Sequence, residues 1–112
     1  MAQDFQISIS PQMAISELID TIGRKSFTGE LIDCYTISCA NDAEVIVAVF
    51  EKHFFRAGNR VTLTVTIHNI DGVTHVHSVG GGGGEGLFRF DWGAADSFSE
   101  MPYNALSRYL IK

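Results

Sequence analysis

Residues 61–77, VTLTVTIHNIDGVTHVH, decide the fold, because apolar and polar side chains alternate on both sides of an Asp-Gly pair. Such alternation is typical of strands with one buried face, and Asp-Gly between two strands predicts a hairpin with a type I′ turn. With Asp71 and Gly72 in that turn, Ile70 opposes Val73, and residues 68 and 66 oppose residues 75 and 77. The apolar side chains then share the core face: Val61, Leu63, Val65, Ile67 and Val76. The polar ones share the other face: Thr62, Thr64, Thr66, His68, His75 and His77.

A short strand and a helix precede this hairpin. Residues 4–9 alternate between polar and apolar side chains, which predicts a half-buried strand. Ser10 followed by Pro11 is typical of a helix start, with serine as the N-cap and proline in the first turn. Gly23 is placed to end a helix of about a dozen residues. The apolar stripe of that helix is expected to be Met13, Ile15, Leu18, Ile19 and Ile22.

The segment between that helix and the hairpin predicts two more strands. Residues 30–39 fit either a strand or a short helix, and their β-branched and aromatic content favours a strand. The pair Asn41-Asp42 indicates a turn. Residues 45–50 are apolar on both faces, which is typical of a central strand that is covered on both sides. Residues 57–59, Ala-Gly-Asn, indicate a further hairpin turn.

The C-terminal third predicts a loop, a strand and a last helix. Residues 80–86 are rich in glycine, and we interpret them as a loop. Residues 88–92 alternate again, and we assign Phe88, Phe90 and Trp92 to the core rather than to a base-stacking surface. Ser97 or Ser99 is the expected cap of the last helix. Its buried stripe is expected to be Met101, Ala105, Leu106, Tyr109 and Leu110.

Together these elements predict a single α+β domain over residues 1–112. The expected order is strand, helix, four or five strands in a meander, and helix. Both helices then lie on one face of an antiparallel sheet. This β-α-β4-α two-layer sandwich is similar in element order to the TATA-binding-protein and helix-grip folds, a similarity that carries no function.

Composition excludes several classes of function. The chain has 112 residues, of which 46% are hydrophobic and 19% charged, and its net charge is −5. Disordered chains are poorer in apolar residues. We expect no nucleic-acid partner, because affinity for the phosphate backbone depends on positive charge.

The compartment is inferred from the ends of the chain and its cysteines. Residues 1–5 lack the pattern of a signal peptide, and no apolar run approaches the ~20 residues of a membrane span. We therefore expect a cytoplasmic protein without a membrane partner. Cys34 and Cys39 should not bridge each other, because on one strand their odd separation puts them on opposite faces.

The sheet face that the helices leave open predicts a partner. Two helices cover one face only, while residues 45–50 are apolar on both. Exposed apolar surface of this kind is covered by a ligand, another part of the chain or a second subunit. We expect a homodimer that forms through this face, because symmetric homodimers are the commonest oligomers.

The hairpin offers a candidate metal site. His68 and His75 are expected to oppose each other, with His77 on the same face. Opposed side chains lie about 5 Å apart, close enough for imidazoles to share a metal such as zinc. The alternative is a solvated polar face without a ligand, which we favour because the spacing places no carboxylate or cysteine beside the histidines.

The glycine-rich run offers a candidate ligand site. It contains a formal GxGxxG at Gly81, Gly83 and Gly86, whose N–H groups could bind a phosphate. The dinucleotide pattern needs a helix directly after it, whereas a strand is expected here. The alternative is a flexible hairpin loop, because glycine loses much conformational entropy on ordering. The candidate residues for a small-molecule ligand are Gly81, Gly83, Glu85, Gly86, Arg89 and Asp91.

Residues 76–94, VHSVGGGGGEGLFRFDWGA, together with residues 61–67, resemble a family of small bacterial proteins. The family is a domain of unknown function seen mostly in Gram-positive bacteria, and the resemblance covers most of the chain. It implies a stand-alone cytosolic domain. It implies no activity, cofactor or catalytic residue.

These observations favour a binding or interaction domain without a recognised catalytic centre. The alternative is a small enzyme that depends on a metal or phosphate ligand at the histidines, Glu85 and Asp91. We expect no cofactor, with zinc at the histidines as the candidate exception.

Overall fold

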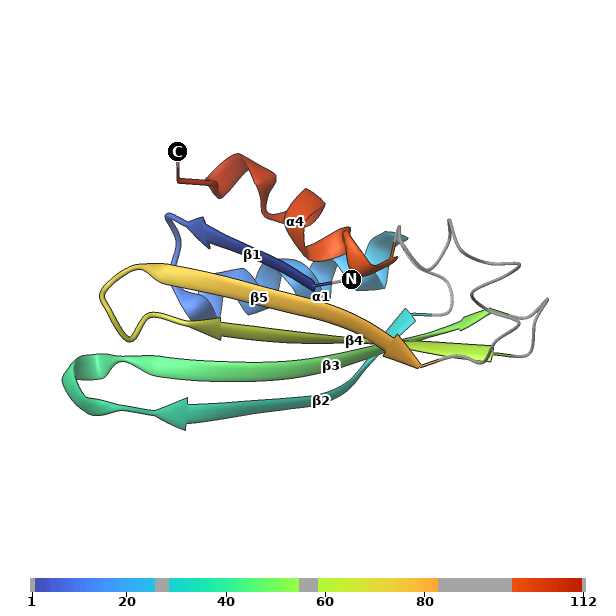
Figure 1. Cartoon of the computed structure of the whole chain (residues 1–112), viewed down its shortest axis with the longest axis horizontal. Coiled ribbons are helices and arrows are strands. Elements are labelled where there is room, and N and C mark those ends of the chain that lie inside the picture. The colour runs from blue at the N-terminus through green and yellow to red at the C-terminus, as the bar shows by residue number, and fades with distance from the viewer. Residues whose placement is uncertain (1, 26–28, 55–58, 83–97, 112) are drawn as a thin grey trace.

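Over the residues that the structure describes, the fold is α+β, with a five-stranded antiparallel sheet and the helices α1 and α4 (Figure 1). The computed structural model describes residues 2–25, 29–54, 59–82 and 98–111. The strand order across the sheet is β1-β5-β4-β3-β2. The elements are β1 (Ala2–Ile7), α1 (Pro11–Lys25), β2 (Gly29–Ser38), β3 (Glu44–Phe54), β4 (Asn59–His68), β5 (Thr74–Gly82) and α4 (Met101–Ala105). Among the described elements the order is β-α-β4-α, as predicted, while the likeness to TATA-binding-protein and helix-grip folds stays a prediction.

The β4–β5 hairpin has the predicted register but a different turn. His68 pairs with His75 as expected. The Ile70–Val73 pair and the type I′ turn are wrong, because Gly72 alone has a positive φ, of 90°, in this loop, whereas type I′ needs two such residues. Two hydrogen bonds of Asn69 account for the different turn. Its Oδ1 accepts a hydrogen bond from the Glu44 N–H at 2.8 Å, and its own carbonyl accepts one from the Gly72 N–H at 3.0 Å.

The ambiguous segment before β3 is a strand. β2 pairs with β3 along its length, and a 3-10 turn at Ala40–Asp42 (η1) joins the two strands. Asn41 and Asp42 have φ angles of 60° and 63°. Asn and Asp tolerate this left-handed conformation better than most residues, which explains the predicted turn at this pair.

Helix α1 begins as predicted but ends later. The Met13 N–H donates to Ser10 Oγ at 3.2 Å, which confirms the N-cap. The helix continues to Lys25, so the prediction that Gly23 ends it is wrong. Gly23 lacks the positive φ with which glycine caps a helix. Met13 and Ile19 do not belong to the buried stripe, because they are 57% and 38% exposed.

The core lies between α1, the C-terminal segment and one face of the sheet. Figure 1 shows α1 behind the strands and α4 beside β1. The predicted alternation in β4 is confirmed, with every second side chain buried. The buried apolar residues are Ile7, Ala14, Ile15, Leu18, Ile22, Ile46, Ala48, Phe50, Val61, Leu63, Val65, Ile67, Val76, Phe98 and Leu106.

The C-terminal segment is not one continuous helix. Glu100 rather than Ser99 occupies the N-cap of α4, which is followed by a 3-10 turn, η2 (Ser107–Tyr109). The chain then becomes extended because it pairs with β1: the Ser8 N–H donates to the Tyr109 carbonyl at 2.9 Å, and Leu110 forms a bridge with Ile7. Tyr109 and Leu110 therefore leave the expected helical stripe and lie along the β1 edge.

The glycine-rich run begins inside the sheet rather than in a loop. Residues 80–82 complete β5 and pair with residues 63–61 of β4. At Gly80 an added Cβ would lie 3.1 Å from the Cβ of Ser99, so glycine permits the close approach of that segment. The rest of the run, the strand expected at residues 88–92, the cap expected at Ser97 and the turn at residues 57–58 lie outside the described residues.

Candidate functional site

The face of the sheet turned away from the core, the open face, has an apolar half on β2 and β3. The register places Tyr35 opposite Val47 and Ile37 opposite Val45. Tyr35 is 60% exposed and Ile37 43%. We call Tyr35, Ile37, Val45, Val47 and Val49 the apolar patch. The segment at residues 45–50 is therefore buried on one face only, where Ile46, Ala48 and Phe50 belong to the core.

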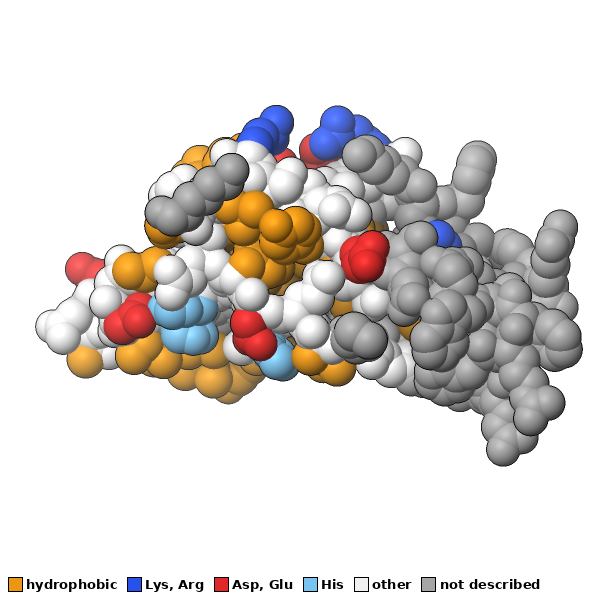
Figure 2. Space-filling model, turned by 45° about the horizontal axis from the view of Figure 1, so that its top comes forward, with side chains coloured by type: hydrophobic (Ala, Val, Ile, Leu, Met, Phe, Trp, Pro, Cys, Tyr) orange, Lys and Arg blue, Asp and Glu red, His pale blue; other side chains and the backbone are white. Residues whose placement is uncertain are grey.

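The other half of the open face is polar and carries the predicted histidines. The rings of His68 and His75 stack with their centroids 4.8 Å apart. His75 Nε2 lies 2.8 Å from an Asp71 oxygen, and His77 Nδ1 lies 2.6 Å from Asp4 Oδ1. Figure 2 shows histidine side chains in two places on this side of the molecule, each beside an acidic side chain. The carboxylates were not part of the predicted site, because Asp4 reaches His77 only through the β1–β5 pairing.

The Asp71 carboxylate has two hydrogen-bond partners within the hairpin. The Val73 N–H donates to its carboxylate at 3.1 Å, and His75 is its second partner. These two hydrogen bonds lower the pKa of Asp71 below its ordinary value of 3.8, the backbone N–H having the larger effect. Hydrogen bonds to the ionised form favour that form.

The three histidines border one hollow but engage different partners. The hollow, of about 560 Å³, lies between β1, the hairpin and the C-terminal residues Leu110 and Ile111. His68 Nδ1 accepts a hydrogen bond from the Ile70 N–H at 3.4 Å, while the other two imidazoles face carboxylates. A zinc ion at His68, His75 and His77 stays a prediction.

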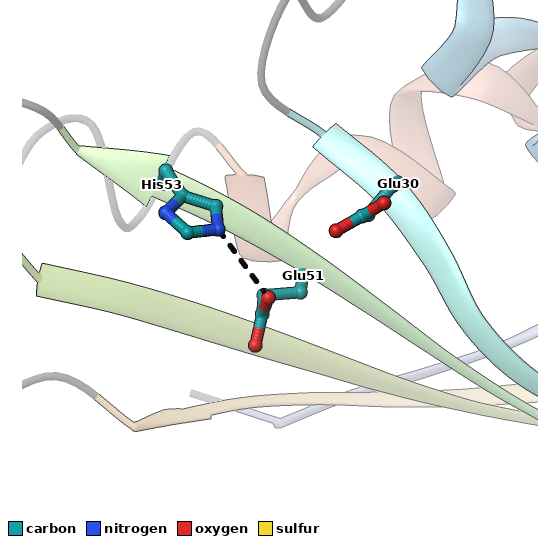
Figure 3. A group of neighbouring side chains, drawn as sticks. All are labelled: Glu30, Glu51 and His53. Atoms are coloured by element: carbon teal, nitrogen blue, oxygen red, sulfur yellow. Dashed lines mark ion pairs between the residues drawn. The ribbon is translucent and has the colours of Figure 1, made fainter.

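A different set of metal-ligating side chains converges at the far end of β3 (Figure 3). One ligand atom from each of Glu30, Glu51 and His53 lies within 4.8 Å of the others. Glu30 opposes Glu51 across the β2–β3 pair, and His53 follows two residues later on the same strand face. Among the residues that the structure describes, this carboxylate–histidine cluster is the one group of at least three such side chains. The Glu-x-His spacing of Glu51 and His53 is a sequence signal for two of its members, but not for Glu30.

The candidate residues of the glycine-rich run are mostly outside the described part of the chain. Gly81 lies on the exposed side of β5, where an added Cβ would contact Thr62 Oγ1 at 3.5 Å. It is thus part of a paired strand. Gly83, Glu85, Gly86, Arg89 and Asp91 are not described, so the ligand site stays a prediction.

The two cysteines are free, as predicted, and both are exposed. Cys34 lies in β2, and Cys39 directly follows that strand. Partial burial and the neighbouring charge of Asp33 raise the pKa of the Cys34 thiol. Because the thiolate is the nucleophile, this environment disfavours reactivity.

Among the described residues, the two edges of the sheet differ in whether another segment pairs with them. The C-terminal segment lines the outer edge of β1, where the Ile111 N–H donates to the Gln6 carbonyl at 3.0 Å. β2 forms the opposite edge and, among the described strands, pairs only with β3. Ile32, Tyr35 and Ile37 on this edge strand are exposed. The bare edge and the apolar patch therefore lie on the same side of the molecule.

The fold is that of a small α+β domain whose sheet exposes apolar side chains on one face. The chain belongs to a family of unknown function, DUF6054, whose model matches residues 1–110. This confirms the resemblance to a domain of unknown function. No curated protein matches the chain, and no solved structure matches it. Within the described residues, none of the helices has the length and apolar character needed to cross a membrane.

Proposed function

We propose that this protein is an interaction module that self-associates face to face through the open face of its sheet. The observation that carries the proposal is the apolar patch. Its three valines are half-buried, and both of its β2 residues are more than 40% exposed. Contiguous apolar surface of this kind marks an interaction site. A second copy of the chain is the simplest occupant, since a two-fold axis lets one patch cover the other.

The size of the open face suits such a contact. Four strands have nine to eleven residues and β1 has six, at ~3.3 Å per residue and ~4.8 Å between strands. The face therefore offers roughly 700 Å², close to the ~800 Å² that each partner contributes to a standard interface. A contact centred on the apolar patch would lie toward the β2 edge of the face, with the threonines and histidines on its polar side.

Sedimentation velocity of the chain tests the proposal. At micromolar concentration we expect a species of twice the 12.3 kDa chain mass. Val47→Asp should yield a monomer, because it places a charge in the centre of the contact. Circular dichroism verifies that the variant is folded. Tyr35→Glu is a second variant that should have the same effect at a more exposed position.

The matched control is Thr36→Asp. Thr36 neighbours Tyr35 on β2, is exposed, and points to the opposite side of the sheet. This variant should remain dimeric. A monomeric wild type, or a Thr36→Asp variant that dissociates as fully as Val47→Asp, contradicts association through the open face.

A further inference from the structure

We propose that Glu30, Glu51 and His53 form a binding site for a divalent transition metal ion, with zinc as the best fit. The site lies on the same open face as the apolar patch, beyond Val49 on β3, but it shares no residue with the patch or with the hairpin histidines. It does not depend on self-association, because all three ligands belong to one chain.

The strand pairing builds the site. Glu30 lies directly opposite Glu51, and His53 projects from the same face of β3 one step further along. Figure 3 shows the three side chains pointing into one shared space. Their nearest ligand atoms lie within 4.8 Å of one another. Ligands of one zinc ion, each about 2.0–2.2 Å from the metal, lie about 3–4 Å apart, so small side-chain rotations would complete the coordination.

The electrostatics of the pair favour a bound cation. Like charges directly opposite each other on neighbouring strands are destabilising. The Glu51 side chain is only 16% exposed, so solvent screens its charge poorly. His53 Nε2 lies 3.5 Å from Glu51 Oε1, and the guanidinium of Arg60, whose side chain is 64% exposed, lies 3.8 Å from the same oxygen. A divalent ion would offset both carboxylates at once, and Arg60 could swing into solvent.

The donor set selects the kind of metal. Magnesium and calcium prefer oxygen ligands alone, whereas an imidazole nitrogen with carboxylates suits zinc and its first-row neighbours. Three protein ligands leave a fourth position for water or a ligand group, as in catalytic zinc sites. The site would therefore hold a metal with an accessible position rather than a closed structural one.

Metal titration tests the assignment. Isothermal titration with zinc chloride and visible absorption with cobalt chloride should show one ion per chain. Glu51→Gln and His53→Ala should each weaken binding by at least about tenfold. Arg60→Gln should tighten binding, because it removes the competing cation; a purely structural role for the cluster predicts no such gain. Urea unfolding verifies that each variant is folded.

The matched controls are His75→Ala and His77→Ala, which remove imidazoles from the hairpin and should leave binding unchanged. Loss of binding in these controls but not in His53→Ala assigns the metal to the hairpin and overturns the proposal. Absence of binding to the wild-type chain at millimolar metal also overturns it. Repeating the titration with the Val47→Asp variant separates this result from the proposed self-association, because the cluster is intact in that variant.

Discussion

Two halves of one sheet face differ in how their side chains are satisfied. On β4, β5 and β1 the open face carries threonines and two histidine–carboxylate pairs, with Val79 as an exposed apolar exception. On β2 and β3 it carries the apolar patch, with Asp33 opposite Val49 and the carboxylate–histidine cluster beyond it. In the polar half, His75 and His77 are paired with carboxylates of the same chain. The apolar half has carbon surface that only another surface can remove from water.

The boundary between the halves runs between β3 and β4, where Val49 faces Thr64 and Val47 faces Thr66. Isolated apolar side chains on a surface are common and indicate no binding site. The five side chains of the apolar patch are contiguous, on two paired strands at an edge that is unpaired among the described strands, and contiguous apolar surface is typical of interaction sites. Under the proposed self-association, the second copy would therefore lie over β2 and β3.

The largest expected effect comes from the core face of the sheet, which lies behind both halves of the open face. Leu63 is fully buried in β4, and its neighbour Thr64 lies on the open face. Leu63→Ala should lower the free energy of unfolding by about 2–5 kcal/mol, since it leaves a cavity. Thr64→Ala should change it by less than about 1 kcal/mol. Urea unfolding at one fixed protein concentration measures both, and equal losses would show that the open side of β4 is as tightly packed as the core side.

Moving the boundary between the apolar and polar halves is expected to have an intermediate effect, on the strength of self-association. Thr64→Val combined with Thr66→Val extends the apolar patch by one strand. The variant no longer has to desolvate two hydroxyls, so self-association should strengthen by roughly tenfold, or about 1.4 kcal/mol. Sedimentation equilibrium measures the change. The control is Thr36→Val, on the other side of β2, which should leave the dissociation constant unchanged; weaker association of the double variant would contradict a contact centred on this face.

Much of this architecture could be predicted from local patterns. Alternation in residues 61–77 determines the register of β4 and β5, because a slip by one residue would bury threonines and expose the core face. The features that were predicted wrongly depend on distant partners. Asn69 reshapes its turn by bonding to Glu44, and the last helix ends where the chain meets β1. Neither partner is visible in the neighbouring sequence.

The candidate sites divide in the same way, into residues set by the local sequence and residues brought together by distant strand pairing. The opposed histidines were predictable because a tight hairpin joins them. The carboxylate–histidine cluster was not, because Glu30 reaches Glu51 only through the β2–β3 register. That register shifts between Leu31 and Asp33, where the strand is irregular. A single shifted residue changes which side chains share a face, so no spacing rule connects residue 30 with residues 51 and 53.

The smallest expected effect is a pH dependence in the polar half. The pKa of Asp71 is lowered in the folded protein, so its ionised form stabilises the fold above its ordinary pKa of 3.8. That contribution is lost as the pH falls through the lowered folded-state pKa. Asp71→Asn should therefore lower the melting temperature slightly at pH 5–7, and the deficit should shrink below about pH 3.8. Because the carboxylate is exposed, the shift is expected to be small.

Melting curves of the wild type and Asp71→Asn across this pH range measure the effect, and Asp20→Asn is the control. Asp20 forms an exposed ion pair with Arg24 on α1, away from the hairpin. A deficit in Asp71→Asn that persists unchanged into acid would mean that its carboxylate acts by shape rather than by charge. The hairpin of the polar half would then be stabilised by its turn geometry and not by the charge of Asp71. The polar half would differ from the apolar patch in packing rather than in ion pairing.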